Sequence, residues 1–384
     1  MIAFGFMGVA AAGISWAWNR SALYGLIYER KFSDPRIFLG DTLEMDLLLT
    51  NKKIVPLSWV KIEDIVPEGV KIVEASKIND APAWDLRYLR HTTAVAWYER
   101  IRWRYKLKFR RRGIYSIGPA NIESGDPFGF LKSKNLTSPP VEVVVYPRVY
   151  PLIELGIPPA RPLGEIKGGN RIFPDPSRLA GIRDYVIGDP IKTIDWKATS
   201  KLSKLMVRTY EPSSTYTVVI CLQTDMVKPH WQSYDAVQLE RVISAAASVA
   251  KYSAEKQYSV GLFCNDMPIV AGKPMTVSPT NDPENLTQVL SALAVIRTFS
   301  IGPMYEVLID YSRRFPFGAT IVLVSAFLPE EMALTLTDLK ARDYKPVVVY
   351  VGNEPCPPLP NGIILHDIAA YFKQREAADA ADQA

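Results

Sequence analysis

The run from Arg183 to Ala198, RDYVIGDPIKTIDWKA, gathers charged side chains around two large aromatic ones. Carboxylates and guanidinium groups at such short spacing form ion pairs or a surface for a charged partner. A plain solvated loop would not need the aromatic residues. We therefore take this run as the candidate partner-binding site, with the members Arg183, Asp184, Tyr185, Asp189, Asp195, Trp196 and Lys197.

Two interpretations of this run remain open. In the first it is a structural lock, in which the guanidinium of Arg183 or Arg208 pairs with a carboxylate at position 184, 189 or 195. Trp196 would then pack against a sheet. In the second interpretation the run is a docking surface beside the domain that comes after it. The two interpretations can hold together.

Enzymatic chemistry has little support elsewhere in the sequence. The three histidines, His91, His230 and His366, lie in different regions. None has the spacing of a zinc site or of a Ser-His-Asp arrangement. The run 164–169 (GEIKGG) lacks the Lys-Ser/Thr of a phosphate-binding loop. We expect no catalytic residues, no cofactor and no enzyme activity.

The charge balance gives only weak support to nucleic-acid binding as the function. The 45 Lys and Arg residues exceed the 40 Asp and Glu residues by a net +5, too little to indicate nucleic-acid binding. One segment is basic, because Lys and Arg alternate with apolar and aromatic residues from Arg102 to Arg110. This alternation predicts a half-buried strand with one basic face. Since its aromatic residues would be buried and could not stack on bases, nucleic-acid binding stays an alternative.

The first 18 residues, Met1 to Trp18, contain no charged side chain. About 18 residues is the short end of what crosses a bilayer, and two tryptophans would lie at the interface. No basic residue precedes the run, which disfavours a secretory signal. We predict a transmembrane anchor over 1–18, a single pass through the cell membrane, and cytoplasmic main domains. A buried helix, or a hairpin with Ser21–Tyr28, is the alternative.

Hydrophobic patterning predicts two folded parts after this segment. Residues 30–150 contain short apolar or alternating runs, such as Thr42–Thr50 and Val141–Tyr146, which predict a β-sandwich. Residues 213–375 alternate apolar strands with helical patterns, as expected for a doubly wound α/β domain. The fold class is therefore mixed, with the β domain first.

The remaining segments connect these parts or lie after them. Residues 151–212 are rich in Pro and Gly at their start and are predicted to be a linker that carries the signature run. Residues 376–384 have no core to join, and we expect a disordered tail.

Three stretches of the chain resemble one bacterial and archaeal family. They are RRGIYSIGPANIESGDPFG from Arg111 to Gly129, the run from Arg183 to Ala198, and the strand Val218–Leu222 with the residues directly after it. The family is called domain of unknown function fifty-eight, and its members are often encoded beside MoxR-type AAA+ ATPases. The resemblance implies a membrane-anchored β domain, a von Willebrand factor A-like domain, and such an ATPase as partner.

Metal binding depends on the strand end after Leu222. Domains of the von Willebrand factor A type that bind Mg²⁺ present Asp-x-Ser-x-Ser there, because the ion demands hard oxygen ligands. This chain has Gln223 at the first position and Val227 at the last, and Ala326 where the family usually has Asp. We therefore expect no intact metal site, although Asp225 could hold a weakly bound ion.

Together these patterns predict a membrane-tethered, non-enzymatic adaptor. By the resemblance, it would work with a MoxR-type AAA+ ATPase in the assembly or maturation of other proteins. A metal-dependent adhesion or sensor module at Asp225 is one alternative. A nucleic-acid-binding protein that uses the basic strand is the other.

Overall fold

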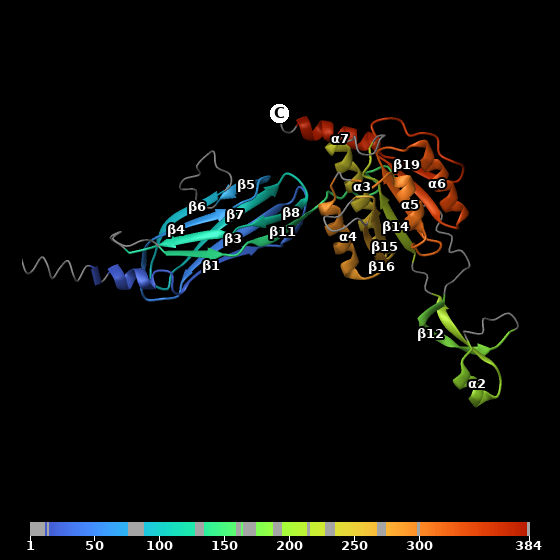
Figure 1. The fold of residues 1–384 in the computed structure, drawn as a ribbon, viewed down its shortest axis with the longest axis horizontal. Helices are drawn as coiled ribbons and strands as arrows, with labels where there is room; N and C mark the ends of the chain where they lie inside the picture. The colour runs from blue at the N-terminus through green and yellow to red at the C-terminus, as the bar shows by residue number, and fades with distance from the viewer. Residues whose placement is uncertain are drawn as a thin grey trace, which may run out of the picture. The chain divides into compact units, whose positions relative to one another are not determined.

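The computed structural model is a mixed α/β protein whose strand-rich N-terminal part precedes an α/β part (Figure 1). It divides into two compact units, Met1–Val149 with Leu290–Ile296 and Tyr150–Val289 with Arg297–Ala384. Each unit has its own hydrophobic core. The structure describes residues 12–13, 15–75, 88–126, 134–158, 163, 174–186, 194–212, 216–226, 235–266, 274–297 and 300–381.

Two four-stranded antiparallel sheets form most of the N-terminal unit. The first has the order β1 (Leu26–Phe32), β3 (Thr42–Asn51), β7 (Arg100–Phe109), β5 (Val70–Ala75). The second has the order β10 (Lys134–Ser138), β9 (Ala120–Ser124), β4 (Leu57–Ile65), β6 (Tyr88–Val95). A smaller sheet joins β2 (Arg36–Phe38), β11 (Val141–Tyr146) and β8 (Gly113–Ile117).

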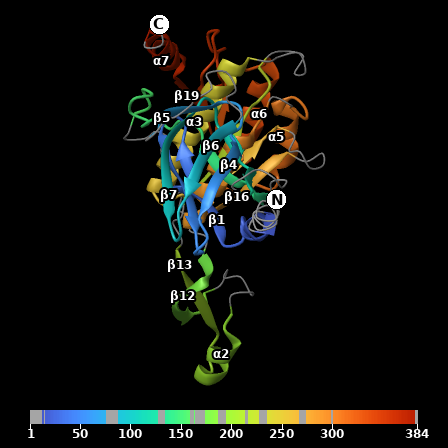
Figure 2. The ribbon, with the colours of Figure 1, turned by 90° about the vertical axis from the view of Figure 1, so that its left-hand side faces the viewer.

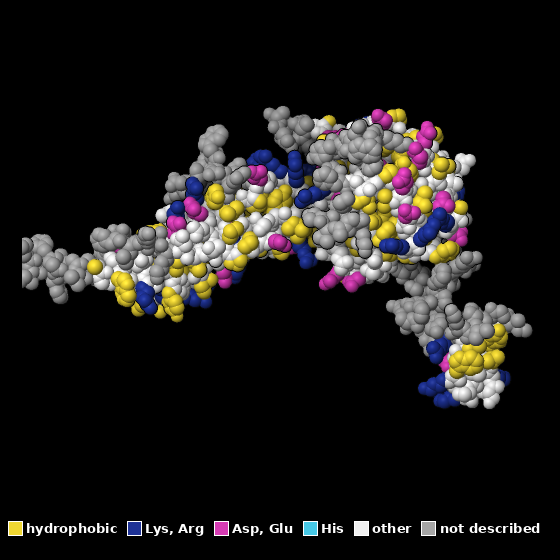
Figure 3. Space-filling view, viewed as in Figure 1, with side chains coloured by type: hydrophobic (Ala, Val, Ile, Leu, Met, Phe, Trp, Pro, Cys, Tyr) yellow, Lys and Arg dark blue, Asp and Glu magenta, His cyan; other side chains and the backbone are white. Residues whose placement is uncertain are grey.

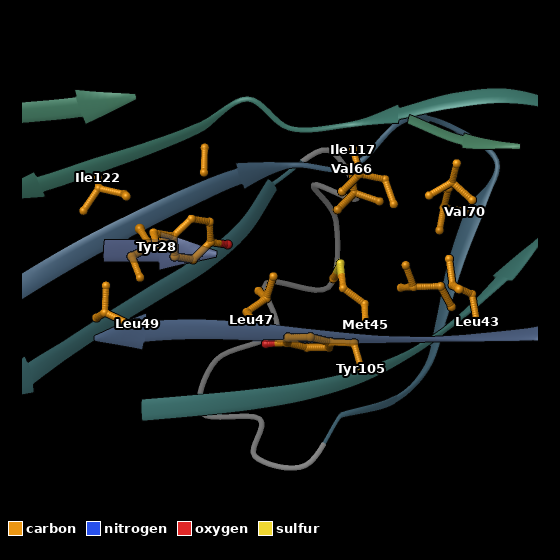
Figure 4. Close-up of a cluster of buried hydrophobic side chains, with 14 of the residues drawn as sticks. Tyr28, Leu43, Met45, Leu47, Leu49, Val66, Val70, Tyr105, Ile117 and Ile122 are labelled. Carbon is orange, nitrogen blue, oxygen red and sulfur yellow. The ribbon is translucent and has the colours of Figure 1, made fainter. Parts of the chain in front are cut away.

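Strict side-chain alternation builds the core of this unit. On β3, Leu43, Met45, Leu47 and Leu49 are buried on one face. They meet buried side chains of the second sheet and of β8, among them Ile122 and Ile117 (Figure 4). Successive side chains of a strand point to opposite faces, so a period of two in the sequence gives one apolar face.

The basic strand predicted at 102–110 is confirmed as β7, which lies between β3 and β5. Its aromatic and apolar members are inward or half-buried, while Arg100, Arg102, Arg104 and Lys108 are exposed. Asp46 of β3 pairs with both Arg102 and Arg104. The basic face is thus partly neutralised by its own sheet.

The predicted transmembrane anchor is wrong. Of residues 1–18, only 12–13 and 15–18 lie in the described part of the chain, and they belong to a helix that ends at Ser21. No helix among the described residues is both long and apolar enough to cross a membrane. A span needs about 20 predominantly apolar helical residues. The predicted single-pass localisation in the cell membrane is therefore wrong as well.

The signature segment is not merely a linker. Residues 174–184 form β12 (Pro174–Asp184), which pairs antiparallel with β13 (Met206–Pro212). The short helix α2 (Trp196–Leu202) lies between them in sequence. Both ribbon views show β12, α2 and β13 together as one small group (Figures 1 and 2). We call these described residues, 174–186 and 194–212, the signature module.

A six-stranded sheet forms the α/β part of the second unit. Its order is β16 (Met275–Thr280), β15 (Ser259–Cys264), β14 (Thr217–Leu222), β17 (Thr320–Ser325), β18 (Lys345–Tyr350), β19 (Ile364–Asp367). All neighbours pair in parallel except β15 and β16, which are antiparallel. The central strands are continuously apolar because helices cover a parallel sheet on both faces.

Among the described residues, five helices accompany this sheet: α3 (Ala236–Glu255), α4 (Pro283–Val295), α5 (Met304–Ser312), α6 (Glu330–Ala341) and α7 (Ala369–Ala381). Buried side chains of α5 and α6 share a core with alternate residues of β14, β17 and β18. Figure 1 shows α3 on the opposite side of the strands from α5 and α6. The thiols of Cys221 on β14 and Cys264 on β15 are fully buried inside the sheet.

The C-terminal helix differs from the disordered tail predicted for 376–384. Helix α7 continues to Ala381, and residues 382–384 lie outside the described part. Glu376 accepts two hydrogen bonds from the buried Arg241 of α3, with N–O distances of 2.5 and 2.6 Å. Phe372 is buried on the inner side of α7. Residues 376–381 therefore continue a helix that is bonded to α3 through Glu376.

Candidate functional site

Asp195 organises the signature module. It precedes α2 as the N-cap, and its Oδ1 accepts hydrogen bonds from the backbone amides of Lys197 and Ala198, both at 3.0 Å. Its Oδ2 accepts from Nε of Arg208 on β13 at 2.9 Å. An aspartate at this position satisfies helix amides that otherwise have no partner. The Arg208 guanidinium and these amides lower the pKa of the Asp195 carboxyl.

This arrangement realises one of the ion pairs in the lock interpretation. The backbone around it is fixed as well, because Asp195 N donates to Met206 O at 2.8 Å and Ile194 bridges to Val207. Helix α2 ends at Ser203, whose φ of 50° lies in the left-handed region. A short helix is thus bonded to β13 at its N-terminal end.

The indole of Trp196 does not pack as the lock interpretation predicted. Trp196 comes directly after the N-cap, and its side chain is 64% exposed. The N-cap geometry holds Asp195 toward Arg208 and leaves the next residue on the outer side of α2. The prediction that Trp196 packs against a sheet is wrong, and the residue is available to a partner.

The other predicted site residues are spread along the module. Arg183 and Asp184 end β12, opposite Val207 and Met206, and both are exposed. Tyr185 N donates to Leu205 O at 2.9 Å. Lys197 is exposed on α2. Asp189 lies outside the described residues.

A second polar cluster lies at the carboxyl ends of the central parallel strands. Asp225, three residues beyond the end of β14, is 3% exposed. Its Oδ1 accepts from Nδ2 of Asn265 at 2.6 Å and its Oδ2 from Nε2 of Gln223 at 2.9 Å. Burial raises the pKa of the Asp225 carboxyl, and the two amide donors offset only part of that effect. We call Gln223, Thr224, Asp225, Asn265 and Ser300 the amide cluster.

Asn265, directly after β15, connects the members of this cluster. Its Oδ1 accepts from both N and Oγ1 of Thr224, at 2.9 and 3.0 Å. A backbone N–H can only donate, so this contact fixes which end of the amide is nitrogen. Nδ2 then faces Asp225, Ser300 Oγ at 3.1 Å and the Gly302 carbonyl at 3.0 Å. An amide nitrogen is thus surrounded by three oxygens from two separate segments.

These residues do not fit Mg²⁺. The cation needs oxygen ligands pointing inward, whereas both carboxylate oxygens of Asp225 are already occupied by amide N–H groups. Ala326, at the end of β17, supplies no ligand side chain, and Val227 lies outside the described residues. Within the described part of the chain, no group of three or more His, Cys, Asp or Glu residues could hold a metal ion.

Asn265 and the role of its amide were not predicted from the sequence. Asn265 and Asp266 come after an apolar strand in the same way that Gln223–Asp225 come after β14. The carboxyl ends of parallel neighbours meet at one edge of a sheet, so this repeated position was the available signal.

The N-terminal unit contains a further unpredicted polar group, which is structural. Asp64 on β4 accepts from Nε and Nη2 of Arg30 on β1 at 2.7 and 2.8 Å and from the Tyr28 hydroxyl at 2.7 Å. Both charged side chains are almost fully buried. Nearby, His91 Nε2 lies 2.7 Å from the Tyr105 hydroxyl, and burial lowers the pKa of His91.

Comparison with known proteins gives one family match. A family model described as "Protein of unknown function DUF58" matches residues 181–356. YeaD, an uncharacterized protein of Bacillus subtilis (strain 168), is 24% identical over 222 residues. These two matches support a DUF58 domain in this part of the chain.

The DUF58 match begins in β12 and extends beyond β18, so it takes in α2, β13 and the amide cluster. The alignment with YeaD covers 57% of this chain and 51% of YeaD, so the chain spans about half the length of that relative. Both the family and YeaD are of unknown function. Neither match therefore assigns an activity or a partner to the chain.

Solved structures resemble the chain only distantly. The CARDB domain of a Pyrococcus furiosus protein is 13% identical, with a TM-score of 0.22, over 31% of this chain and 91% of that domain. A cohesin module from Clostridium perfringens is 12% identical, with a TM-score of 0.22, over 31% of this chain and 97% of the module. Likenesses this low carry no functional argument.

Proposed function

We propose that the chain is a non-enzymatic adaptor that binds other proteins through its signature module. The exposed Trp196, on a helix that Asp195 and Arg208 hold in place, supports this most directly. Tryptophan is among the residues that contribute most to protein–protein binding. An exposed indole on a fixed helix also loses little conformational entropy when a partner covers it.

The chemistry of the described residues supports an adaptor better than an enzyme. His91 is buried between Tyr105 and Trp103, where it stacks on the indole with ring centroids 4.5 Å apart. The thiols of Cys221 and Cys264 have pKa values raised by burial, which disfavours the nucleophilic thiolate. Neither group has the exposure or the neighbours that catalysis requires.

The resemblance stated above suggests the partner, a MoxR-type AAA+ ATPase, and a role of the complex in protein assembly or maturation. It also suggests that the six-stranded sheet and its helices are a von Willebrand factor A-like domain. The amide cluster favours this adaptor over the metal-dependent adhesion module, because amide groups already bind the carboxylate that such a module would use.

The test is binding of the purified ATPase to the full chain and to variants of the module. Trp196→Ser should weaken binding at least about tenfold, the loss of a central contact residue. Trp97→Ser is the matched control, because Trp97 is 65% exposed in the turn between β6 and β7. Asp195→Ala should weaken binding more than Asp195→Asn, which keeps an N-cap oxygen. Wild-type affinity in both Trp196→Ser and Asp195→Ala would refute the proposal.

A further inference from the structure

The charges of the signature module are mostly basic on and around α2. Lys197 and Lys201 are one turn apart on this helix, and Lys204 lies just beyond it; all three are exposed. No acidic residue occurs between Trp196 and Val207. The carboxylate of Asp195 is already engaged by Arg208 and by two helix amides. This part of the module therefore presents positive charge without a nearby carboxylate on α2 to neutralise it.

Large apolar side chains lie beside these lysines. Ile182 on β12 lies opposite Arg208 in the strand pair. Arg208 donates a hydrogen bond to Asp195, the residue directly before Trp196. Just beyond the same end of the pair, the backbone of Leu205 bonds to Tyr185, and Val186 is the next residue along the chain. Figure 3 shows hydrophobic side chains gathered on one face of the module, with Lys and Arg side chains at its border. The exposed large apolar residues in the described part of the module are Ile182, Val186, Trp196, Leu202 and Leu205.

We propose that this surface binds a partner segment in which apolar residues are flanked by aspartate or glutamate, an inference that rests on the adaptor function proposed above. Removal of the apolar side chains from water supplies the free energy of binding. Carboxylates opposite Lys197, Lys201 and Lys204 supply charge complementarity, which raises the association rate and excludes basic partners. An apolar patch with a polar rim is the usual anatomy of such a site.

The apolar composition favours a protein segment over nucleic acid. Four of the five exposed apolar residues are aliphatic, and bases stack on aromatic side chains instead. Phosphates would be attracted by the lysines, but they would leave Ile182, Val186, Leu202 and Leu205 in water. A segment with its own apolar residues covers both parts of the surface.

The experiment is selection from a library of random peptides displayed on phage, with the immobilised full chain as target. Peptides enriched by the wild-type chain should combine Asp or Glu with Leu, Phe or Trp. As synthetic fluorescent peptides, they should lose at least about tenfold in affinity with Lys197→Glu, Lys201→Glu and Lys204→Glu combined. The same substitutions at the exposed Lys31, Lys71 and Lys108 of the N-terminal unit are the control. A triple Lys→Gln variant should also lose affinity for the peptides. If its thermal unfolding is unchanged, the loss of charge, and not of folding, is responsible.

The outcomes separate this inference from the adaptor function. Enriched peptides that bind through Trp196 but contain no acidic residues would overturn the acidic partner and leave the adaptor function standing. Peptides that bind the Trp196→Ser variant as well as wild type, or a selection without enrichment, would count against both. Tighter binding of a single-stranded oligonucleotide than of any selected peptide, with the same dependence on the three lysines, would assign the surface to nucleic acid and overturn the inference.

Discussion

Asn265→Asp is the substitution that best tests the amide cluster. In the wild-type chain, Asn265 Nδ2 donates to Asp225 Oδ1 at 2.6 Å and also faces two uncharged oxygens. Aspartate has nearly the same shape but replaces this donor by a second carboxylate oxygen. The cluster would then have two facing carboxylates and the oxygens of Ser300 and Gly302, which is the donor set that a divalent cation prefers.

The size of the effect can be worked out from the geometry. Two unit charges at 2.6 Å repel by about 6 kcal/mol at an effective dielectric constant of about 20. The pair avoids part of this by holding a proton, and keeping one carboxyl protonated at neutral pH costs at most about 4 kcal/mol. A loss of that size lowers the melting temperature of a domain of this size by on the order of 10 °C.

The assay is thermal unfolding of the full chain in EDTA and in millimolar Mg²⁺ or Mn²⁺. We expect the Asn265→Asp variant to be destabilised in EDTA and to regain stability with either cation, because a bound ion stabilises the folded state. Asn285→Asp is the control, since the buried Asn285 amide donates to two uncharged oxygens, the carbonyls of Val260 and Thr280. Two results would contradict this prediction: the cations stabilise the wild-type chain as much as the variant, or Asn265→Asp is as stable as wild type in EDTA.

Two further predictions concern the N-terminal unit. Asp64→Asn leaves the buried Arg30 without its counter-charge and should lower the free energy of unfolding by about 3–5 kcal/mol in urea denaturation; a loss below about 1 kcal/mol would contradict the buried pair. Because burial lowers the pKa of His91, the unfolded chain takes up a proton below about pH 6.5 that the folded chain resists, so stability should fall as pH drops through that value. His91→Gln should remove this dependence, and an unchanged slope between neutral and mildly acidic pH would count against it.

Elements set by local patterning could be predicted from the sequence. The alternation in 102–110 gives β7 because burial on one face of a strand needs only a period of two. The helical patterns predicted within 213–375 are observed, for example, as α3 (Ala236–Glu255), with Asp235 as its N-cap. Both signals lie within a few residues of the feature that they predict.

Contacts between distant segments could not be predicted in the same way. Arg30 and Asp64 are 34 residues apart, and nothing local pairs them. The strands did contain a sign of burial, since each charged residue shares its parity with apolar neighbours, Arg30 with Tyr28 and Asp64 with Ile62. A charge on the inward parity of two strands indicates a buried partner, but not which one.

The candidate site was predicted in part for the same reason. Asp195 before an apolar and basic helical run is a local capping signal, and Arg208 was among its candidate partners. The exposure of Trp196 depends on how α2 rests on β13, which the sequence does not specify. Asn265 was missed because its role depends on two parallel strands lying side by side.

The buried thiols make the α/β sheet suited to kinetic measurement. Cys221 and Cys264 lie on adjacent strands with no exposed surface, while Cys356 is partly exposed and burial raises its pKa to about 11. The thiolate is the form that attacks an alkylating reagent, so the intact chain offers the reagent only one slow site. Modification of the other two requires the strands to separate. The rate at which Cys221 and Cys264 are labelled therefore reports the rate of spontaneous opening of the sheet, with no reporter group added to the chain.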